Sequence, residues 1–380
     1  MSDRVRLVVW APVVALALAA PFSLTSFWLQ TGLFAMAAAI GAIGLTLLVG
    51  VTGQLSLAHA FFVALGAYGY GFLAGSGDGR VHGVGLPAPL AVAGAVALAG
   101  AAGALFSPIA GRLRGIYLGL ASLGLVFLGQ HVLHNAPAVT GGFNGRDVAP
   151  FELFGFSFTS TDPDLVLFRV PFGALERLWY LGLALLALAY WYARNLLAGR
   201  PGRALVGVRD SEVAAAVMGV DVRWYKAAAF TVAGVYAGLA GVLLALAFGR
   251  IVPDSFGFAM SIDFLAMIII GGLGSIAGAV AGALLVTALP LVLSHYSDRI
   301  GFLAEPGEAG VGAAEAARLL YGAAVVAVLL FARGGLAELL SSSRRRFARS
   351  REHPDARGKE PSHETSSGIG QRPASGADRV

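Results

Sequence analysis

Residues 33–51 read LFAMAAAIGAIGLTLLVGV, a run without a charged side chain, and the polar turn Thr52–Ser56 follows it directly. A helix that crosses the hydrocarbon core of a bilayer needs about 20 apolar residues, so this run predicts a membrane-spanning helix. The rest of the chain has the same character, because 57% of its 380 residues are hydrophobic and only 13% are charged. Its mean hydropathy is +0.74. Since soluble proteins carry about 25% charged residues, the composition argues against a soluble enzyme.

Further apolar runs predict an all-α, polytopic membrane helix bundle of about 8–10 spans. Within Ser261–Leu293, a pair of runs is broken by the glycine-rich turn Gly271–Ser275, which fits a tilted helical hairpin or a re-entrant pair. The predicted organisation is an N-terminal membrane helix at 1–32, a transmembrane domain at 33–333 and a basic, disordered tail at 334–380. The other predicted spans are Val5–Leu29, Ser56–Gly75, Leu86–Phe106, Ile116–Val132, Leu175–Ala193, Ala227–Gly249 and Ala316–Phe331.

The distribution of basic residues predicts how the chain lies in the membrane. The net charge of +5 does not indicate nucleic acid here, because in a membrane protein the position of the charges matters most. Arginine is concentrated near Arg112, in Arg194–Lys226 and in the tail, and basic loops stay on the cytoplasmic side. We therefore expect both termini in the cytoplasm. The run Arg344–Arg351 is either a solvated topology anchor without a specific partner or a segment that contacts anionic membrane lipid.

Missing motifs exclude several kinds of chemistry. A phosphate-binding loop needs Lys followed by Ser or Thr, and neither Lys226 nor Lys359 has that context. ATP hydrolysis therefore needs a partner subunit, and no cofactor is expected. The chain has no cysteine and no HExxH motif, so neither an enzyme nor a metal site is predicted. A secondary transporter would carry ionisable groups within its spans, whereas Asp263 is expected at a helix start, where it would act as a cap.

A short helix is predicted inside the charged segment Arg194–Lys226. Acids precede the small apolar run Val213–Met218 and a glycine ends it, as at typical helix boundaries. A helix of about two turns is too short to be stable alone. Its apolar face suits insertion into a groove of a partner protein, and a position on the membrane surface is the alternative. The candidate contact residues are Asp210, Glu212, Ala214, Ala215, Met218 and Gly219.

Polar residues at the entry to the third predicted span are candidates for a solute path. Gln54, Ser56 and His59 stand at the edge of a membrane helix, where polar groups are costly and tend to face a cavity. Gly53 would allow local unwinding, and a hydrogen bond to a neighbouring helix is the other interpretation of His59. A second polar cluster, Thr140–Gly145, predicts a tight outer loop that serves as a gate, a docking surface or a plain connector.

Glycines repeat at four-residue spacing in two places. Gly274, Gly278 and Gly282 form one series, and Gly234 and Gly238 form another. Small residues on one helix face let membrane helices approach closely. The pattern predicts helix packing, either at mobile or subunit-facing contacts or within a single chain.

Several of these motifs together resemble the permeases of branched-chain amino-acid ABC importers, the LivM family. The resemblance covers residues 33–293, but within the loop 134–173 it is confined to Thr140–Gly145, and it does not extend to the tail. The motifs that carry it, in chain order, are Thr52–Ala60, Leu113–Leu118, Thr140–Gly145, parts of Gly202–Phe230, Pro253–Phe256 and Gly271–Ser275.

The resemblance implies a permease subunit of an ATP-driven importer for branched-chain, hydrophobic amino acids in the bacterial inner membrane. It further implies a second homologous permease, two ABC ATPase subunits and an extracytoplasmic solute-binding protein as partners. The helix around Glu212–Gly219 would be the coupling helix that seats in an ATPase. Urea or short-chain amide importers use related permeases and remain the alternative, and a secondary transporter is a more distant one.

Overall fold

The computed structural model describes residues 15–77, 81–113, 115–159, 165–167, 170–296, 312–331 and 335–336. The chain divides into two units, Met1–Leu339 and Leu340–Val380. Most of the predicted tail at 334–380 lies outside the described residues, and so do residues 1–14 of the predicted first span. All helices and strands named below belong to the first unit.

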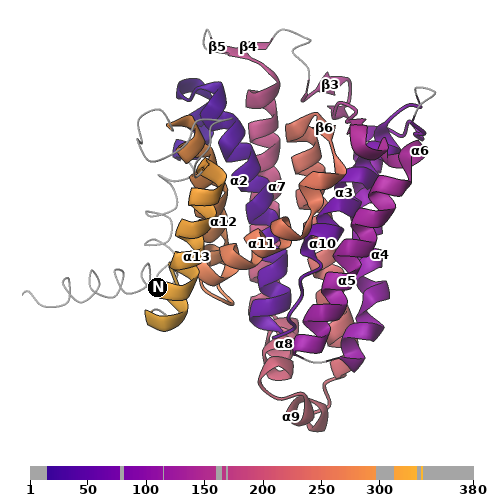
Figure 1. The fold of residues 1–380 in the computed structure, drawn as a ribbon, viewed down its shortest axis with the longest axis vertical. Coiled ribbons are helices and arrows are strands. Elements are labelled where there is room, and N and C mark those ends of the chain that lie inside the picture. Colours follow the sequence, from indigo (N-terminus) through magenta and orange to yellow (C-terminus); the bar gives the residue numbers. More distant parts are fainter. Residues whose placement is uncertain are drawn as a thin grey trace, which may run out of the picture. The chain divides into compact units, whose positions relative to one another are not determined.

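The first unit is an all-α helix bundle, as predicted (Figure 1). Among the described residues, six helices are long and apolar enough to cross a membrane. They are α2 (Ser26–Leu45) continued by the π-helix η1 (Thr46–Val51), α4 (Ala88–Arg112), α5 (Ile116–Asn135), α7 (Ala174–Ala198), α10 (Val222–Phe248) and α12 (Ile276–His295). The shorter apolar helices are α3 (His59–Ala74) and α11 (Phe258–Gly271), and α13 (Ala313–Phe331) is the last.

The helix boundaries follow the predicted spans closely except at the N-terminal side. Residues 15–23 are helical, the chain is extended at Thr25, and α2 begins at Ser26. The predicted span Val5–Leu29 therefore runs past the break at Thr25 into α2. The predicted span that begins at Leu33 misses the first residues of α2. The reason is that apolar residues continue on both sides of the break, so hydropathy alone gives no sign of it.

The core of the bundle is formed by α2–η1 and α10, which are buried along most of their length, whereas α5 and α7 expose most of theirs. Backbones touch at the contacts of α10. A Cβ atom added at Gly66 of α3 would lie 2.1 Å from the carbonyl oxygen of Gly238, and one at Gly234 would lie 2.5 Å from that of Ala99 in α4. Close packing at Gly234 and Gly238 is thus confirmed, and it occurs within one chain.

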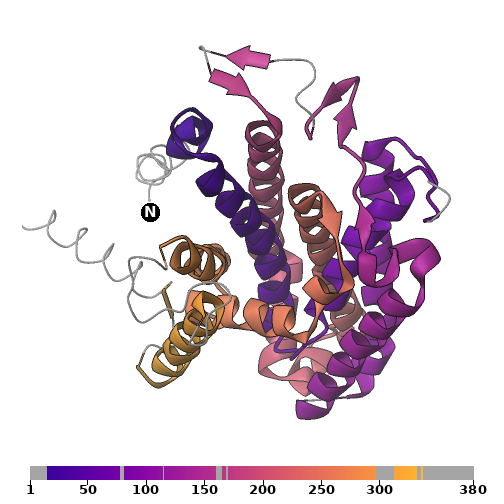
Figure 2. The same ribbon diagram turned by 45° about the horizontal axis from the view of Figure 1, so that its top comes forward.

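Short strands lie at one end of the bundle, and the helices α8 (Arg200–Asp210) and α9 (Glu212–Val217) lie at the other (Figures 1 and 2). The predicted loop 134–173 contributes most of these strands, together with α6 (Pro137–Thr140) and the 3₁₀ turn η2 (Gly142–Asn144). The antiparallel pairs are β1 (Arg146–Asp147) with β6 (Arg250–Ile251), β2 (Glu152–Leu153) with β3 (Phe156–Ser157), and β4 (Leu165–Leu167) with β5 (Val170–Phe172).

The glycine-broken pair is a helical hairpin, α11 and α12, joined by the turn Gly272–Ser275. Helix α11 has 14 residues and runs across the long helices, whereas α12 has 20 and is long enough to cross a membrane unaided (Figure 1). The two backbones meet next to the turn, since a Cβ atom at Gly278 would lie 2.1 Å from the carbonyl oxygen of Gly271.

We predict that G282A destabilises the bundle, because a Cβ atom there would lie 2.0 Å from the carbonyl oxygen of Met267 in α11. Overpacking of this kind costs about 1–3 kcal/mol. The measurement is thermal unfolding of the purified protein in detergent. The matched control is G124A on α5, where an added Cβ meets nothing within 4 Å. Equal unfolding temperatures for the two variants would contradict the prediction.

Candidate functional site

Helix α9 projects from the end of the bundle opposite the strands (Figure 1). Its N-terminus is capped by Ser211, whose hydroxyl accepts a hydrogen bond from the Ala214 amide at 3.2 Å. The helix ends at Val217, and Gly219 follows with φ +83°, a left-handed conformation that glycine adopts without strain. Asp210, predicted to open this helix, is instead the last residue of α8, because the extended Ser211 separates the two helices.

Some apolar side chains of α9 and of the residue that follows it are buried, and others are exposed. Ala215 is buried, whereas Val213, Val217 and Met218 are exposed, the last two with 85% of their surface accessible. Ala214 is also exposed. Exposed apolar side chains grouped on a short, well-capped helix are typical of a surface that docks on a partner.

An ion pair fixes α9 to the long helix α10. The Nζ atom of Lys226 lies 2.5 Å from Oε1 of Glu212, and Lys226 is almost fully buried while Glu212 keeps 28% of its side chain exposed. An amine buried in an apolar surrounding is costly unless it is paired. Glu212 therefore holds the first turn of α9 against the bundle.

The four residues predicted for a solute path lie at the connection between η1 and α3. Gly53 has φ +70°, and the chain from Gly53 to Ala58 forms no regular helix. Gln54 and Ser56 are buried there, and Gln54 donates to the Thr52 hydroxyl at 3.1 Å while its Oε1 has no hydrogen-bond partner.

His59 is the first residue of α3 and is fully buried. Its ring packs edge-on against Phe264 of α11, with centroids 4.6 Å apart. Its Nε2 atom faces the backbone of Gly41 in α2 without a properly directed hydrogen bond. The histidine thus joins three helices in the interior of the chain.

The polar turn and the start of α9 line one pocket of about 340 Å³. Thr52, Gly53 and Gln54 form one side, and the stretch from Val208 to Val213 forms another. Lys226, Leu113, Gly115 and Leu118 complete the wall. The candidate path residues and the candidate partner-binding helix are therefore neighbours, although they are far apart in the sequence.

The glycine series that begins at Gly274 does not lie on one helix face. Gly278 and Gly282 belong to α12 and face α11, whereas Gly274 precedes the helix in the turn, with φ +83°. The helical interpretation of Gly274 was wrong, because Ser275 caps α12 by accepting the Gly278 amide at 3.1 Å. Gly274 instead lies against Gly50, where an added Cβ atom would approach its nitrogen to within 2.4 Å.

The predicted capping role of Asp263 was also wrong, because this residue does not lie at the start of a helix. Helix α11 begins at Phe258, so Asp263 lies inside it and accepts a hydrogen bond from the Tyr321 hydroxyl of α13 at 2.6 Å. The bond ties α13 to α11. Asp263 is therefore an acid inside an apolar helix, where none was expected from the sequence.

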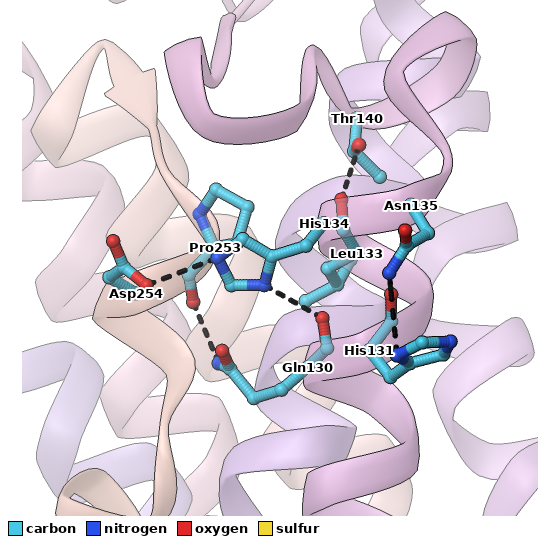
Figure 3. A network of polar contacts seen from close by, with 8 residues as sticks. All are labelled: Gln130, His131, Leu133, His134, Asn135, Thr140, Pro253 and Asp254. Carbon is cyan, nitrogen blue, oxygen red and sulfur yellow. Dashed lines mark hydrogen bonds and ion pairs between the residues drawn. The ribbon is translucent and has the colours of Figure 1, made fainter.

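At the strand end, a polar network connects α5 with η3 (Pro253–Phe256), as Figure 3 shows. The His134 ring lies 3.1 Å from Oδ1 of Asp254 and 2.8 Å from the carbonyl oxygen of Gln130. The side-chain amide of Gln130 donates a hydrogen bond to the Pro253 carbonyl at 2.8 Å. Thr140 donates to the Leu133 carbonyl at 2.6 Å. The predicted Thr140–Gly145 cluster is thus the tight turn that follows α5.

Comparison with known proteins identifies the class. The chain belongs to the family described as branched-chain amino acid transport system / permease component, whose model matches residues 28–329. It is a multi-pass membrane protein of that family. No solved structure matches it significantly.

The similar proteins described below are all permease proteins. The permease protein LivM of the high-affinity branched-chain amino acid transport system of Escherichia coli K12 is 33% identical over 75% of this chain and 68% of its own length. The permease protein LivH of the same kind of system in Salmonella typhimurium is 27% identical over 68% of this chain and 82% of its own. The ribose import permease RbsC of Escherichia coli K12 is 27% identical over 65% and 71%.

We predict that E212A destabilises the protein by about 2 kcal/mol, because it leaves the buried Lys226 amine without its carboxylate. The double variant E212A/K226M should recover most of this loss, since neither charge then remains. Thermal unfolding of the two variants and of K226M, all in detergent, measures the coupling between the two residues. Additive effects would show that the ion pair does not stabilise the site.

Proposed function

We propose that the chain is the transmembrane permease subunit of an ATP-driven importer for branched-chain, hydrophobic amino acids. The observation that carries the proposal is α9, a capped helix whose exposed Val217 and Met218 side chains project from a membrane bundle of the branched-chain permease family. The chain has no nucleotide-binding loop, so ATP-driven transport needs a partner subunit that hydrolyses ATP, and α9 has the size and surface of a coupling helix.

The partners follow from the same argument. ABC ATPase subunits bind ATP and receive α9 in a surface groove, so that the permease itself needs no cofactor and catalyses no reaction. A second, homologous permease subunit completes the membrane part, and similarity to both the LivM and the LivH proteins supports this pairing. A solute-binding protein delivers the amino acid on the extracytoplasmic side, where the strand-bearing end lies.

The solute path passes the turn Gly53–Ser56 and His59. The burial of Gln54, Ser56 and His59 inside the bundle, and the Oε1 of Gln54 and Nε2 of His59 that lack hydrogen-bond partners, support this role. Buried polar groups without partners are costly, and a passing polar solute or water would satisfy them in another state of the permease.

We predict that the α9 end faces the cytoplasm of the bacterial inner membrane and the strand end faces outward. The natural chain has no cysteine, so single cysteines report sidedness directly. Phe154 and Met218 are suitable positions, because both side chains are exposed. In spheroplasts that express the permease without ATPase subunits, F154C should react with a membrane-impermeant maleimide while the cells are intact, and M218C only after permeabilisation. Reaction of M218C in intact spheroplasts would reverse the orientation.

We predict that M218D weakens the binding of co-expressed ABC ATPase subunits in a detergent pull-down by about thirtyfold, because an acid in a buried interface anchor costs about 2 kcal/mol. The control is F154D, which places the same charge on an exposed aromatic position at the opposite end. Recovery equal to wild type with M218D would contradict docking through α9.

The substrate is tested with the complete complex in proteoliposomes. ATP-dependent uptake of leucine, isoleucine and valine is expected, and urea, acetamide and ribose should neither be taken up nor compete. Preferred uptake of urea or acetamide would assign the chain to the amide importers, and uptake without ATP would overturn the importer proposal.

A further inference from the structure

Arg209 lies where the α8–α9 segment meets the end of the core membrane helix. It is the residue before the last of α8, and its Nη1 atom donates a hydrogen bond to the carbonyl oxygen of Gly50 in η1 at 3.2 Å. The two residues are 159 positions apart in the sequence. The contact joins a segment outside the long helices to the most deeply buried helix of the bundle.

The carbonyl of Gly50 is available because the helix unwinds at this point. The amides of Gly53 and Gln54 bond back to the carbonyls of Val49 and Leu48, at 3.2 Å each, and so bypass Gly50. The last carbonyls of a helix lack intrahelical donors and carry a partial negative charge. A guanidinium group is therefore a favourable partner at this position.

The fit around Arg209 is steric as well as polar. A Cβ atom built on Gly53 would lie 2.9 Å from Cγ and 3.7 Å from Cβ of Arg209, so the arginine stem lies directly on the polar turn. Gly50, the residue whose carbonyl accepts the Arg209 hydrogen bond, also lies against Gly274 in the turn between α11 and α12. The end of η1 is thus held between Arg209 and the α11–α12 hairpin.

Neighbouring residues fix the position of Arg209. Its Nε and Nη2 atoms both lie 3.1 Å from Oδ1 of Asp210, which orients the plane of the guanidinium. Leu205 and Val208 are buried and anchor α8 to the bundle. On the far side, only Ser211 separates α8 from α9. A displacement of α9 therefore reaches Arg209 through a short and well-anchored helix.

We propose that Arg209 is a positioning residue that transmits the movement of α9 to the turn Gly53–Ser56 and hence to His59. Its contacts with Gly50 and Gly53 persist during transport, so that α8, α9 and the polar turn move as one body. This inference rests on the proposed function, because it assumes that an ATPase moves α9.

The first test compares ATP hydrolysis and leucine uptake in proteoliposomes of the complete complex. R209A should keep ATPase activity while uptake per ATP falls about tenfold, the effect of losing a charge-assisted hydrogen bond. R209K, which retains a positive donor, should fall between R209A and wild type. The control is R203A, an exposed arginine on the same helix, which should match wild type.

The second test restores the connection covalently. The 3.7 Å between the two Cβ positions matches the separation in disulfides, about 3.8 Å. G53C/R209C, oxidised in the cysteine-free background, should recover the uptake per ATP that R209C loses, and reduction should abolish the recovery. G53C alone reports the cost of a side chain at this left-handed position.

The outcomes separate the possible failures. Wild-type complexes without ATP-dependent uptake would overturn the proposed function together with the inference. Active wild type with R209A equally well coupled would overturn the inference alone, and so would a disulfide that blocks uptake, because the contact would then have to open. Equal loss of ATPase and uptake in an assembled R209A complex would also overturn it, since the residue would then serve the ATPase rather than the link.

Discussion

Close contact between the backbones of glycine- and alanine-bearing helices is the interaction on which this bundle depends. Lipid tails are as apolar as leucine side chains, so helices in a membrane gain little from hydrophobic burial against each other and associate through packing. Helix α10 contacts α3 at Gly238 and α4 at Gly234 with almost no space between backbones. This packing ties α10 to α3 and α4 at positions where a side chain larger than hydrogen has no room.

The ends of the core helices are where polar groups gather. The unwound turn after η1 holds buried Gln54 and Ser56, and it leaves the Gly50 carbonyl for a side chain from α8. Within a membrane, broken helices are tolerated only where protein or water covers the freed backbone groups. Arg209 and the glycine turn at Gly274 provide this cover. The same residues that satisfy the backbone thus connect the end of the bundle that bears α9 with the candidate solute path.

Hydropathy predicted most of the fold correctly, because each long helix is a continuous apolar run bounded by polar residues or charges. It failed where that condition does not hold. The break before Ser26 lies between apolar residues, and Asp263 was assigned to a helix end because the first turn of α11 was not recognised. The boundaries of α9 were predicted to within a residue or two, since Ser211 and Gly219 carry local backbone signals that need no tertiary partner.

The sequence by itself determined the membrane class, the order of the apolar helices, and the presence of a short capped helix between two charged stretches. These features depend on composition and on interactions between residues close together in the chain. Only the tertiary structure decided that Arg209 meets Gly50, that Asp263 meets Tyr321, and that Gly274 packs against the end of η1. The reason is physical: such contacts join residues that are distant in sequence, so their geometry depends on how the helices pack and not on any local pattern of residues.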